Sequence, residues 1–280
     1  MDTIRELEAL RARIAGWKRD GLRIGFVPTM GNLHAGHYSL IELAQRHADR
    51  VVASVFVNPT QFGPNEDFSR YPRTPEQDAA GLAAAGTDAL WMPSLATMYP
   101  YGADKTVAIR VPGVTEILEG AHRPGHFDGV ATVVARLFNQ VQPDIAVFGR
   151  KDYQQLAVIR YLVADLAFPV DLIAAETRRE PDGLAMSSRN QYLSPEERAI
   201  APVIHRTLLA MRDGTRAGRP RVQVEADASA DLHQAGLDPD YAVIRNPDLS
   251  EPATRDGSFV ALIAARLGRT RLIDNLEFEA

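Results

Sequence analysis

Residues 22–59 read LRIGFVPTMGNLHAGHYSLIELAQRHADRVVASVFVNP, and this stretch decides the fold. It opens with an apolar run at 22–28, continues at helical spacing through Leu40 and Leu43, and ends with a second apolar run at 50–59. Nearly continuous apolar runs that alternate with helical segments are typical of βαβ units, whose parallel strands are buried on both faces of a sheet. We therefore expect a parallel sheet covered by helices.

Further apolar runs repeat this pattern along the chain. They are DALWMP (88–93), TVAIRV (106–111), DIAVFG (144–149) and PVDLIAA (169–175). Together with the opening stretch they predict an α/β protein with a doubly wound, Rossmann-like parallel sheet, which we assign to a first domain over residues 1–179. Ahead of the first run, apolar residues recur at helical spacing from Ile4 to Ile14, and Thr3 with Glu6 has the pattern of a capping box. We expect a packing helix there.

The pattern changes near residue 180. Ser194, Pro195 and Glu197 form the start signal of a helix, with an N-cap, a proline and an acid. Three strand-like runs follow, at 241–245, 259–268 and 270–274, and a short Gly-Arg turn joins the last two as in a hairpin. Residues 180–280 are therefore predicted to form a smaller α+β domain, which we expect to act as a lid and to take part in a dimer.

Composition narrows the classes of protein to which the chain can belong. The chain has 280 residues, 24% of them charged, a formal net charge of −5 and no cysteine. No basic block suggests binding to nucleic acid, and disulfides and zinc–thiolate sites are excluded. No apolar run approaches the roughly 20 residues that span a bilayer, and the charged N-terminus does not resemble a signal peptide. We expect a soluble cytoplasmic protein without a nucleic-acid or membrane partner.

A candidate anion site lies where the first run meets its helix, in VPTMGNLHAGHYSL (27–40). Unpaired backbone N–H groups at a helix start carry partial positive charge and bind phosphate. Ala35 and Gly36 are small enough to let a phosphate chain approach the backbone, and the imidazoles of His34 and His37 can donate hydrogen bonds to it.

Other interpretations of this segment were weighed. Gly31 and Gly36 have the spacing of a P-loop, but His37 and Tyr38 stand where Lys and Ser/Thr are required. His34 and His37 could ligate zinc, although no third ligand is obvious. Two histidines that merely satisfy hydrogen bonds at a helix start remain the plain alternative for this short pattern.

Polar clusters follow the other predicted strands as well. They comprise residues 58–62, 149–155, 177–180 and 186–190. Ligands of open α/β sheets bind at the carboxyl ends of the strands, so these clusters are expected to gather around one site. Lys151 is one of only three lysines, the others being Lys18 and Lys105, in a chain that otherwise uses arginine.

The motifs PTMGNLHAGH, VNPTQF, HRPGHFDGVATVV, FGRKDYQQ and GLAMSSRNQYLS follow one another along residues 22–195. In this order they resemble the motifs of the pantothenate synthetase (pantoate–β-alanine ligase) family, which belongs to the HxGH nucleotidyltransferase superfamily. The resemblance implies an ATP-dependent ligase that joins pantoate to β-alanine with Mg²⁺. It further implies a pantoyl adenylate intermediate, release of AMP and pyrophosphate, and a homodimer.

The resemblance also implies roles for individual residues. The catalytic residues would be His37, His34, Lys151 and Arg189. ATP would be held by Met30, Gly31, Asn32, Leu33, His34, Ala35, Gly36, His37, Gly149, Arg150, Lys151, Asp152, Arg178, Met186, Ser187, Ser188 and Arg189. Pantoate would be held by Gln61 and Gln155, β-alanine by Gln61, and Mg²⁺ by Asp78.

Some positions carry an alternative interpretation or depart from the family pattern. Asp78 also reads as an ordinary acid in the first turns of a helix. Arg123 and His126, in HRPGHFDG, could reach the substrate or could belong to a surface loop. Arg178 stands where the family commonly has an aliphatic residue, at a backbone contact to the nucleotide. That contact can survive the change, but the adenine pocket can differ from that of the family.

The residue types fit the chemistry that the resemblance implies. A carboxylate that attacks an α-phosphate brings two anions together, so cations and N–H donors must offset the repulsion and no protein nucleophile is needed. The rival interpretations are another adenylyl-transferring enzyme on the same fold and a nucleotide-binding regulator without turnover. A phosphate acceptor would favour a denser cationic pocket than the paired glutamines provide.

Overall fold

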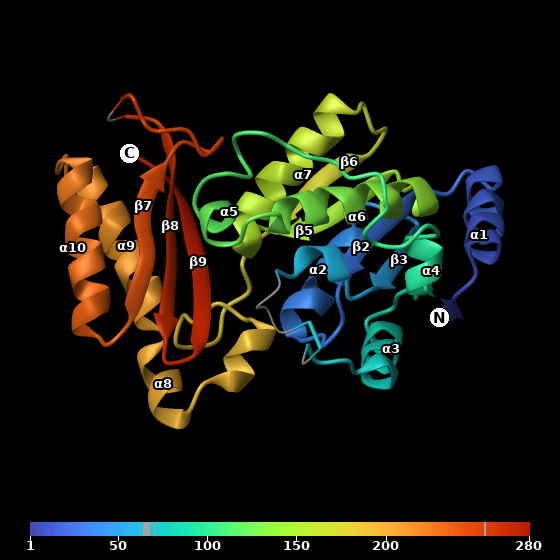
Figure 1. Cartoon of the computed structure of the whole chain (residues 1–280), viewed down its shortest axis with the longest axis horizontal. Coiled ribbons are helices and arrows are strands. Elements are labelled where there is room, and N and C mark those ends of the chain that lie inside the picture. Colours follow the sequence, from blue (N-terminus) through green and yellow to red (C-terminus); the bar gives the residue numbers. More distant parts are fainter. Residues whose placement is uncertain (64–67, 70, 255) are drawn as a thin grey trace. The chain divides into compact units, whose positions relative to one another are not determined.

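The computed structural model describes residues 1–63, 68–69, 71–254 and 256–280. These residues form two compact units, which Figure 1 shows with the sequence coloured from blue to red. The first unit comprises Met1–Gly149 and Gln154–Ala175. The second comprises Arg150–Tyr153 and Glu176–Ala280, so the three residues that follow β5 and the first residue of α7 belong to it.

The first unit is built on a six-stranded sheet whose strands are all parallel (Figure 1). Its strands, in the order β1-β4-β3-β2-β5-β6, are Asp2–Ile4, Ala89–Trp91, Arg50–Val55, Ile24–Thr29, Ile145–Gly149 and Asp171–Ala175. This confirms the predicted doubly wound α/β class. The strands lie where the apolar runs predicted them, with two exceptions.

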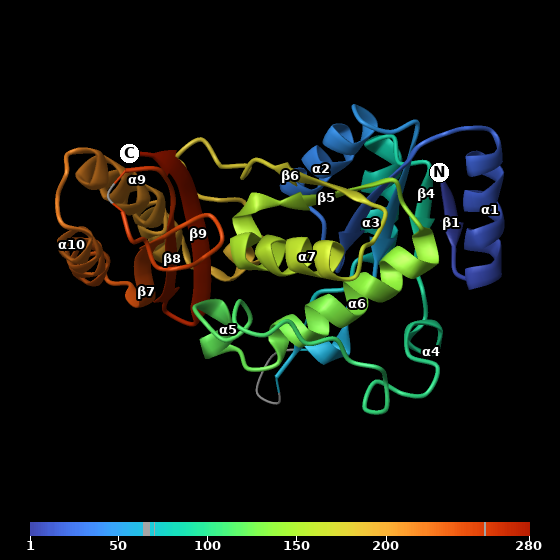
Figure 2. The ribbon, with the colours of Figure 1, turned by 90° about the horizontal axis from the view of Figure 1, so that it is seen from above.

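Helices cover both faces of this sheet. They are α1 Leu7–Arg19, α2 Ala35–Gln45, α3 Pro75–Ala84, α4 Leu95–Met98, α5 Glu119–His122, α6 His126–Val141 and α7 Tyr153–Asp165, with the 3-10 turn η1 Pro59–Gln61. The 3-10 turn η2 Arg150–Asp152 belongs to the second unit. Figure 2 shows α2 and α3 on one side of the strands and α6 and α7 on the other. Val27, Ile41, Leu82 and Leu90 are fully buried between sheet and helices on the first side. Burial on both faces explains why the strands read as continuous apolar runs.

The exceptions are β1, which was not predicted, and the run at 106–111, which was predicted as a strand and is not one. Ile4 belongs to β1, which pairs with β4, and α1 begins after Glu6, whose side chain makes no capping hydrogen bond; the predicted capping box with Thr3 is wrong. The run TVAIRV at 106–111 forms no strand, and the side chain of Val107 is 80% exposed. An apolar run becomes a strand only where a neighbouring strand accepts it, and this segment instead passes over the surface.

The second unit is a three-stranded antiparallel sheet with helices. Its strands are β7 Asp238–Arg245, β8 Ser258–Leu267 and β9 Thr270–Glu279, in that order, and its helical segments are η3 Ser188–Tyr192, α8 Pro195–Ile200, α9 Val203–Arg216 and α10 Arg221–Gln234. Ile204, Leu208 and Met211 line one buried face of α9 at helical spacing. The three predicted strands and the helix that Ser194 caps are confirmed. Within the described part of the chain, no helix is long and apolar enough to cross a membrane.

The strand order creates a switch point between β2 and β5. From β2 the sheet continues through β3 and β4 in one direction, whereas β5 leads to β6 in the other. β2 pairs directly with β5, with Gly25 opposite Ile145. Ligands of open α/β sheets bind beyond the carboxyl ends of the strands at such a point. The segment after Thr29 and the chain that leaves Gly149 therefore start from the position that the fold favours for a ligand.

Candidate active site

The HxGH loop, residues 30–37, connects β2 to the start of α2. His34 is the N-cap residue of α2, and its Nδ1 accepts a hydrogen bond from the Gly36 N–H over 3.1 Å. His37 in turn accepts at Nδ1 from the His34 N–H over 3.3 Å, which completes a capping box of two histidines. The local sequence folds this way because each imidazole nitrogen satisfies an N–H that the helix start leaves unpaired.

This capping fixes the tautomers of the two imidazoles. A backbone N–H can only donate, so Nδ1 of each ring is an acceptor and the proton of each neutral ring lies on Nε2. The ring centroids of His34 and His37 are 4.2 Å apart. The helix start thus presents two imidazoles whose Nε2 atoms are hydrogen-bond donors, beside N–H groups with partial positive charge. This arrangement suits an anionic ligand.

Asp78 of α3 holds the first half of the HxGH loop. Its Oδ2 accepts from the Asn32 N–H over 3.0 Å and its Oδ1 from the Leu33 N–H over 2.8 Å, and the residue is 2% exposed. Gly31 and Asn32 both have positive φ angles, 84° and 53°. A Cβ atom at Gly31 would lie 2.8 Å from Asp78 Oδ2, so this tight turn requires glycine. The loop conformation and the buried carboxylate depend on each other.

A second turn, formed by Asn58 and the η1 residues that follow it, comes after β3, the strand that pairs with β2. Asn58 is fully buried, and its Oδ1 accepts from the Thr60 N–H over 3.4 Å and from the Tyr99 hydroxyl over 2.5 Å. Burial raises the pKa of the Tyr99 phenol, so the hydroxyl stays protonated and donates. Gln61, the predicted pantoate residue, is the buried last residue of this turn.

The start of α6 packs directly on this turn. Asn58 Nδ2 donates to the Gly129 carbonyl over 3.1 Å, and a Cβ at Gly129 would lie 2.3 Å from the Thr60 carbonyl oxygen. His126 donates from Nδ1 to the Gln61 carbonyl over 2.8 Å. The structure therefore brings the motif HRPGHFDG against VNPTQF, as neither motif indicated by itself.

His126 has a defined tautomer as well. Because Nδ1 donates to a carbonyl, the neutral ring accepts at Nε2, and Arg123 Nη1 lies 3.1 Å from that atom. Arg123 also pairs with Glu119 across 3.6 Å. Within this motif His126 is thus tied to the backbone of Gln61, and Arg123 lies next to His126. A contact of either residue with the substrate stays a prediction.

The neighbouring glutamines of α7 have different surroundings. Gln154 is buried, accepts from the Glu119 N–H over 2.9 Å and donates to the carbonyls of Val114 and Ile117, each over 2.7 Å. It therefore holds the chain that leads into α5. Gln155, the other predicted pantoate residue, is half-buried.

The remaining predicted residues lie in the second unit, apart from Gly149, which ends β5. The GRKD turn, residues 149–152, contains Arg150, whose Nη1 contacts Glu277 Oε2 at 2.6 Å and Glu176 Oε1 at 2.9 Å. The side chain of Lys151 is 16% exposed, and its Nζ lies 3.9 Å from Asp152 Oδ1. Among the side chains of this turn, Arg150 is thus the one held firmly by carboxylates.

The 178–190 loop forms a narrow hairpin. Met186 N–H donates to the Arg178 carbonyl over 2.9 Å, and the Arg178 side chain is exposed. The predicted contact of Arg178 with the nucleotide thus falls on a residue whose carbonyl already accepts one hydrogen bond. Ser187 caps η3 by accepting from the Arg189 N–H over 3.2 Å, so Ser187, Ser188 and Arg189 form one ordered turn.

No group of three or more His, Cys, Asp or Glu residues suited to a metal ion occurs within residues 1–63, 68–69, 71–254 and 256–280. Both oxygens of Asp78, the predicted Mg²⁺ ligand, accept backbone N–H groups.

Four residues with clear structural roles were not predicted. Asn58 and Tyr99 hold the turn of Gln61, and Asp274 and Asn275 contact the segments around Lys151 and Arg179. Asn58 lies within a motif that was singled out, so its position next to Gln61 was a usable signal. Asp274 and Asn275 lie in a run that indicated only a strand, and nothing in their spacing points to a site.

Fold and sequence motif together define a class: a doubly wound α/β protein with an HxGH loop at the carboxyl end of its sheet. Comparison with known proteins narrows this class. The model of the family Pantoate-beta-alanine ligase matches residues 2–277. The chain therefore belongs to the pantoate–β-alanine ligase family.

Individual relatives agree with this assignment. The pantothenate synthetase of Stenotrophomonas maltophilia (strain K279a) is 66% identical over 278 residues, which cover 99% of this chain and 100% of the relative. The pantothenate synthetase of Xanthomonas axonopodis pv. citri (strain 306) is 67% identical over 279 residues, with the same coverage. The chain is thus an enzyme of the ligase class that its family name describes.

Solved structures are similar over the whole chain. A crystal structure of pantothenate synthetase from Thermus thermophilus has a TM-score of 0.91 at 48% identity and covers 99% of both chains. A pantoate–β-alanine ligase from Francisella tularensis, complexed with β-γ ATP and β-alanine, has a TM-score of 0.82 at 33% identity, covering 99% of this chain and 97% of that one. These similarities confirm the α/β fold with its small C-terminal sheet.

Proposed function

We propose that this enzyme condenses pantoate with β-alanine in two steps, through a pantoyl adenylate. In the first step a pantoate carboxylate oxygen attacks the α-phosphorus of ATP, and pyrophosphate leaves. In the second the β-alanine amine attacks the acyl carbon, AMP leaves, and an amide forms. The observation that carries this proposal is the pair of histidines at the start of α2, whose Nδ1 atoms both accept backbone N–H groups.

The first step needs negative charge to be offset. We assign ATP to the HxGH loop, with His34 and His37 donating from Nε2 to phosphate oxygens. Such donors are held in place before the reaction, so their interaction with the growing charge of the transition state costs no reorganisation. Lys151 and Arg189 are assigned to the same phosphates as cations. No covalent enzyme intermediate is required, because positioning and electrostatics suffice for this transfer.

The remaining nucleotide contacts are assigned to the other segments of the site. Met30, Gly31, Asn32, Leu33, Ala35 and Gly36 of the HxGH loop are assigned to ATP, and so are Gly149, Arg150, Asp152, Arg178, Met186, Ser187 and Ser188. The carboxylates of Glu176 and Glu277 neutralise the Arg150 guanidinium. We therefore expect Arg150 to contact ATP without pairing its charge with a phosphate.

Pantoate is assigned to Gln61 and Gln155, and β-alanine to Gln61. A neutral amide can donate to a carboxylate and also accept from a hydroxyl, which suits a hydroxy acid. Gln61 is supported in this role by its buried turn, which Asn58 and His126 hold from two sides. A rigid substrate-orienting residue is expected where the reacting carboxylate must be aimed at phosphorus.

Mg²⁺ is proposed to enter with ATP and to neutralise charge on the departing pyrophosphate. Asp78 is the protein carboxylate assigned to it. Each Asp78 oxygen accepts one N–H and retains a lone pair with which the carboxylate could hold the cation.

We further infer a lid role for residues 180–280, a homodimer and a cytoplasmic location. An acyl adenylate hydrolyses readily in water, so closure of a mobile part over it would serve the chemistry. The dimer and the location rest on the resemblance to the family.

The test is a product analysis of the wild-type protein with ATP, Mg²⁺, pantoate and β-alanine. Equal amounts of pantothenate, AMP and pyrophosphate are expected, with turnover dependent on both acid and amine. ADP and phosphate as products would contradict the adenylate route. ATP binding without any turnover would instead favour a regulator, and transfer of AMP to a phosphate acceptor an adenylyltransferase.

A further inference from the structure

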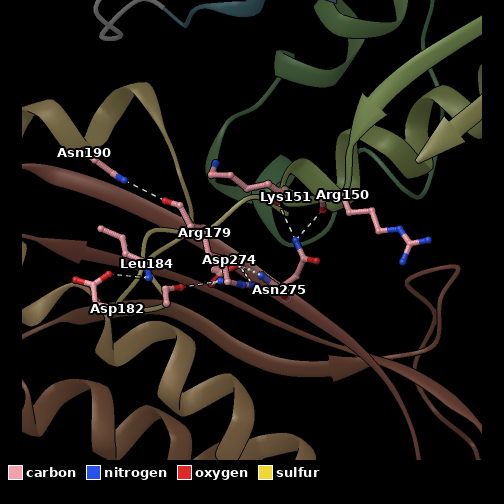
Figure 3. A network of polar contacts seen from close by, with 10 residues as sticks. Arg150, Lys151, Arg179, Asp182, Leu184, Asn190, Asp274 and Asn275 are labelled. Atoms are coloured by element: carbon pink, nitrogen blue, oxygen red, sulfur yellow. Dashed lines mark hydrogen bonds and ion pairs between the residues drawn. The ribbon is translucent and has the colours of Figure 1, made fainter. Parts of the chain in front are cut away.

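A network of buried polar contacts in the second unit joins both nucleotide segments to strand β9. Figure 3 shows Asp274 and Asn275 at its centre, with Lys151 and Arg150 on one side and Arg179 on the other. Asp274 and Asn275 are 4% and 5% exposed. β9 pairs with β8 along one edge only, since it is the last strand of its sheet. Its other edge is available for these contacts.

Asn275 fixes the GRKD turn. Its Nδ2 donates to the Arg150 carbonyl over 2.9 Å and to the Lys151 carbonyl over 2.8 Å, so both amide protons are used on two successive peptide groups. Two adjacent carbonyls held by one rigid amide set the orientation of the peptide planes on either side of Lys151. They thereby set the direction in which the Lys151 side chain leaves the backbone.

Asp274 fixes the 178–190 loop through Arg179. The Arg179 guanidinium donates Nη1 to Asp274 Oδ2 over 2.6 Å and Nη2 to Asp274 Oδ1 over 3.0 Å, which is a bidentate pair. The same guanidinium donates to the Gly183 carbonyl over 3.1 Å and to the Asn275 carbonyl over 3.3 Å. It therefore stabilises the hairpin, because Arg179 and Gly183 both belong to the 178–190 loop.

Asp274 Oδ1 links the contacts of Arg179 to those of Asn275. Asp274 Oδ1 also accepts from the Asn275 N–H over 2.8 Å, so the carboxylate that holds Arg179 also holds the residue that holds the GRKD turn. Buried polar groups in such a network are costly to leave without partners, because the low local dielectric strengthens each lost bond. A change at one residue is thus transmitted to both segments.

We propose that Asp274 and Asn275 are positioning residues for adenylate formation, which keep the Lys151 turn and the Ser187–Arg189 turn in one fixed arrangement. This inference rests on the proposed assignment of those segments to ATP. It adds a role for the C-terminal strand, whose residues touch neither substrate in the proposed site but determine where the cations Lys151 and Arg189 lie.

The decisive variant is Asn275→Asp, which keeps the shape but replaces the one NH₂ group that donates to two carbonyls by an oxygen that cannot donate. We expect kcat/KM for ATP to fall about 10- to 100-fold while KM for pantoate stays within about twofold. A loss of this size is typical when a residue that orients a functional side chain, here Lys151, is changed. Asn275→Gln keeps the amide and should recover part of the loss. Asp274→Asn, which weakens the pair with Arg179, should show the same selective effect on ATP.

Asp240→Asn is the matched control. Asp240 of β7 forms a partly buried ion pair over 2.6 Å with Arg271 of β9, so the variant breaks a contact of the same strand that involves neither Asp274 nor Asn275. The variant should lower thermal stability by an amount similar to Asn275→Asp while leaving kcat/KM for ATP unchanged.

The inference is overturned if Asn275→Asp folds and retains the ATP parameters of the wild type, or if KM rises equally for ATP, pantoate and β-alanine. If Asn275→Asp does not fold, Asn275→Gln and Asp274→Asn decide by the same criteria. A wild-type protein that makes no pantothenate would contradict the proposed function, which is a separate result because it requires no variant.

Discussion

Asp78 Oδ1 accepts a hydrogen bond from the Leu33 N–H over 2.8 Å, and this contact ties α3 to the HxGH loop. The other oxygen of Asp78 accepts from the Asn32 N–H, so both residues that precede His34 are held by one buried carboxylate. The position of the two histidines therefore depends on a helix that is more than forty residues away in sequence. Asp78 has a structural function whether or not it also meets Mg²⁺.

The first prediction concerns Asp78→Asn. The amide replaces one oxygen by an NH₂ group, which cannot accept the N–H that faces it. We expect the free energy of unfolding to fall by about 1–3 kcal/mol, the usual cost of a buried donor without a partner. We also expect kcat/KM for ATP to fall, because the loop is no longer held. Chemical denaturation and ATP kinetics over a series of Mg²⁺ concentrations measure both effects.

The control is Glu76→Gln, an exposed acid in the first turn of the same helix, which should leave both quantities unchanged. If Asp78→Asn regains full activity at high Mg²⁺ with unaltered stability, Asp78 acts as a metal ligand and not as the support of the loop.

The second prediction concerns His126, whose Nδ1 donates to the Gln61 carbonyl. His126→Ala removes this donor and should raise KM for pantoate several-fold, with little change in KM for ATP. His126→Asn supplies an amide N–H in place of Nδ1 and should recover most of the effect. Steady-state kinetics with each substrate varied in turn provide the comparison. Equal KM values for pantoate in the two variants would show that the hydrogen bond does not orient Gln61.

The third prediction concerns the close approach of α6 to η1. Gly129→Ala places a Cβ against the Thr60 carbonyl, and the backbone there cannot move aside as a flexible side chain would. Overpacking of this kind typically costs about 1–3 kcal/mol, so thermal stability should drop and KM for pantoate should rise. Gly16→Ala, in α1 with open space around the new Cβ, should stabilise the protein by up to about 1 kcal/mol. If Gly129→Ala behaves like Gly16→Ala, the packing described for this motif is incorrect.

Part of the fold could be predicted from the sequence. Residues 22–59 indicate the βαβ unit correctly because strands buried on both faces, such as β2, carry apolar side chains at nearly every position. β1 was missed because its three residues, Asp2–Ile4, are held as a strand only by the distant β4. TVAIRV misled for the converse reason, since most of its residues are apolar but no strand among the described residues pairs with it.

Among the site residues, too, contacts within one short motif could be predicted and contacts between distant residues could not. His34 and His37 are recognisable because the capping and the ligand contact depend on residues within one short motif. The pairing of Asn58 with Tyr99, and of Asp274 with Arg179, joins residues far apart in the chain. Such pairs carry no periodicity or local spacing, so a single sequence gives no physical reason to connect them.

The fourth prediction concerns pH and His205. Burial, and next the positive charge of Arg179, lower the pKa of the His205 imidazole from its usual 6.5. Below pH 6.5 the unfolded chain then binds a proton that the folded protein still rejects, so stability is lost as the pH falls through this range. The loss in Tm between pH 7.5 and 5.5 should be smaller in His205→Gln than in the wild type.

His233→Gln is the control for this effect, since His233 is exposed on α10, and its Tm should follow that of the wild type. Identical pH dependence in His205→Gln and in the wild type would mean that protonation of His205 is not linked to unfolding.

We expect pantoate and ATP, held at the HxGH loop, to form the adenylate before β-alanine binds. Rapid mixing of the enzyme with ATP, Mg²⁺ and pantoate, without β-alanine, tests it most directly through the time course of pyrophosphate. We predict a burst of about one pyrophosphate per active site, followed by slow release, as an accumulating intermediate requires. The burst should be lost in His37→Ala, since removal of one preorganised donor typically lowers the rate about 10²–10³-fold. Pyrophosphate that appears only after β-alanine is added would contradict the two-step mechanism.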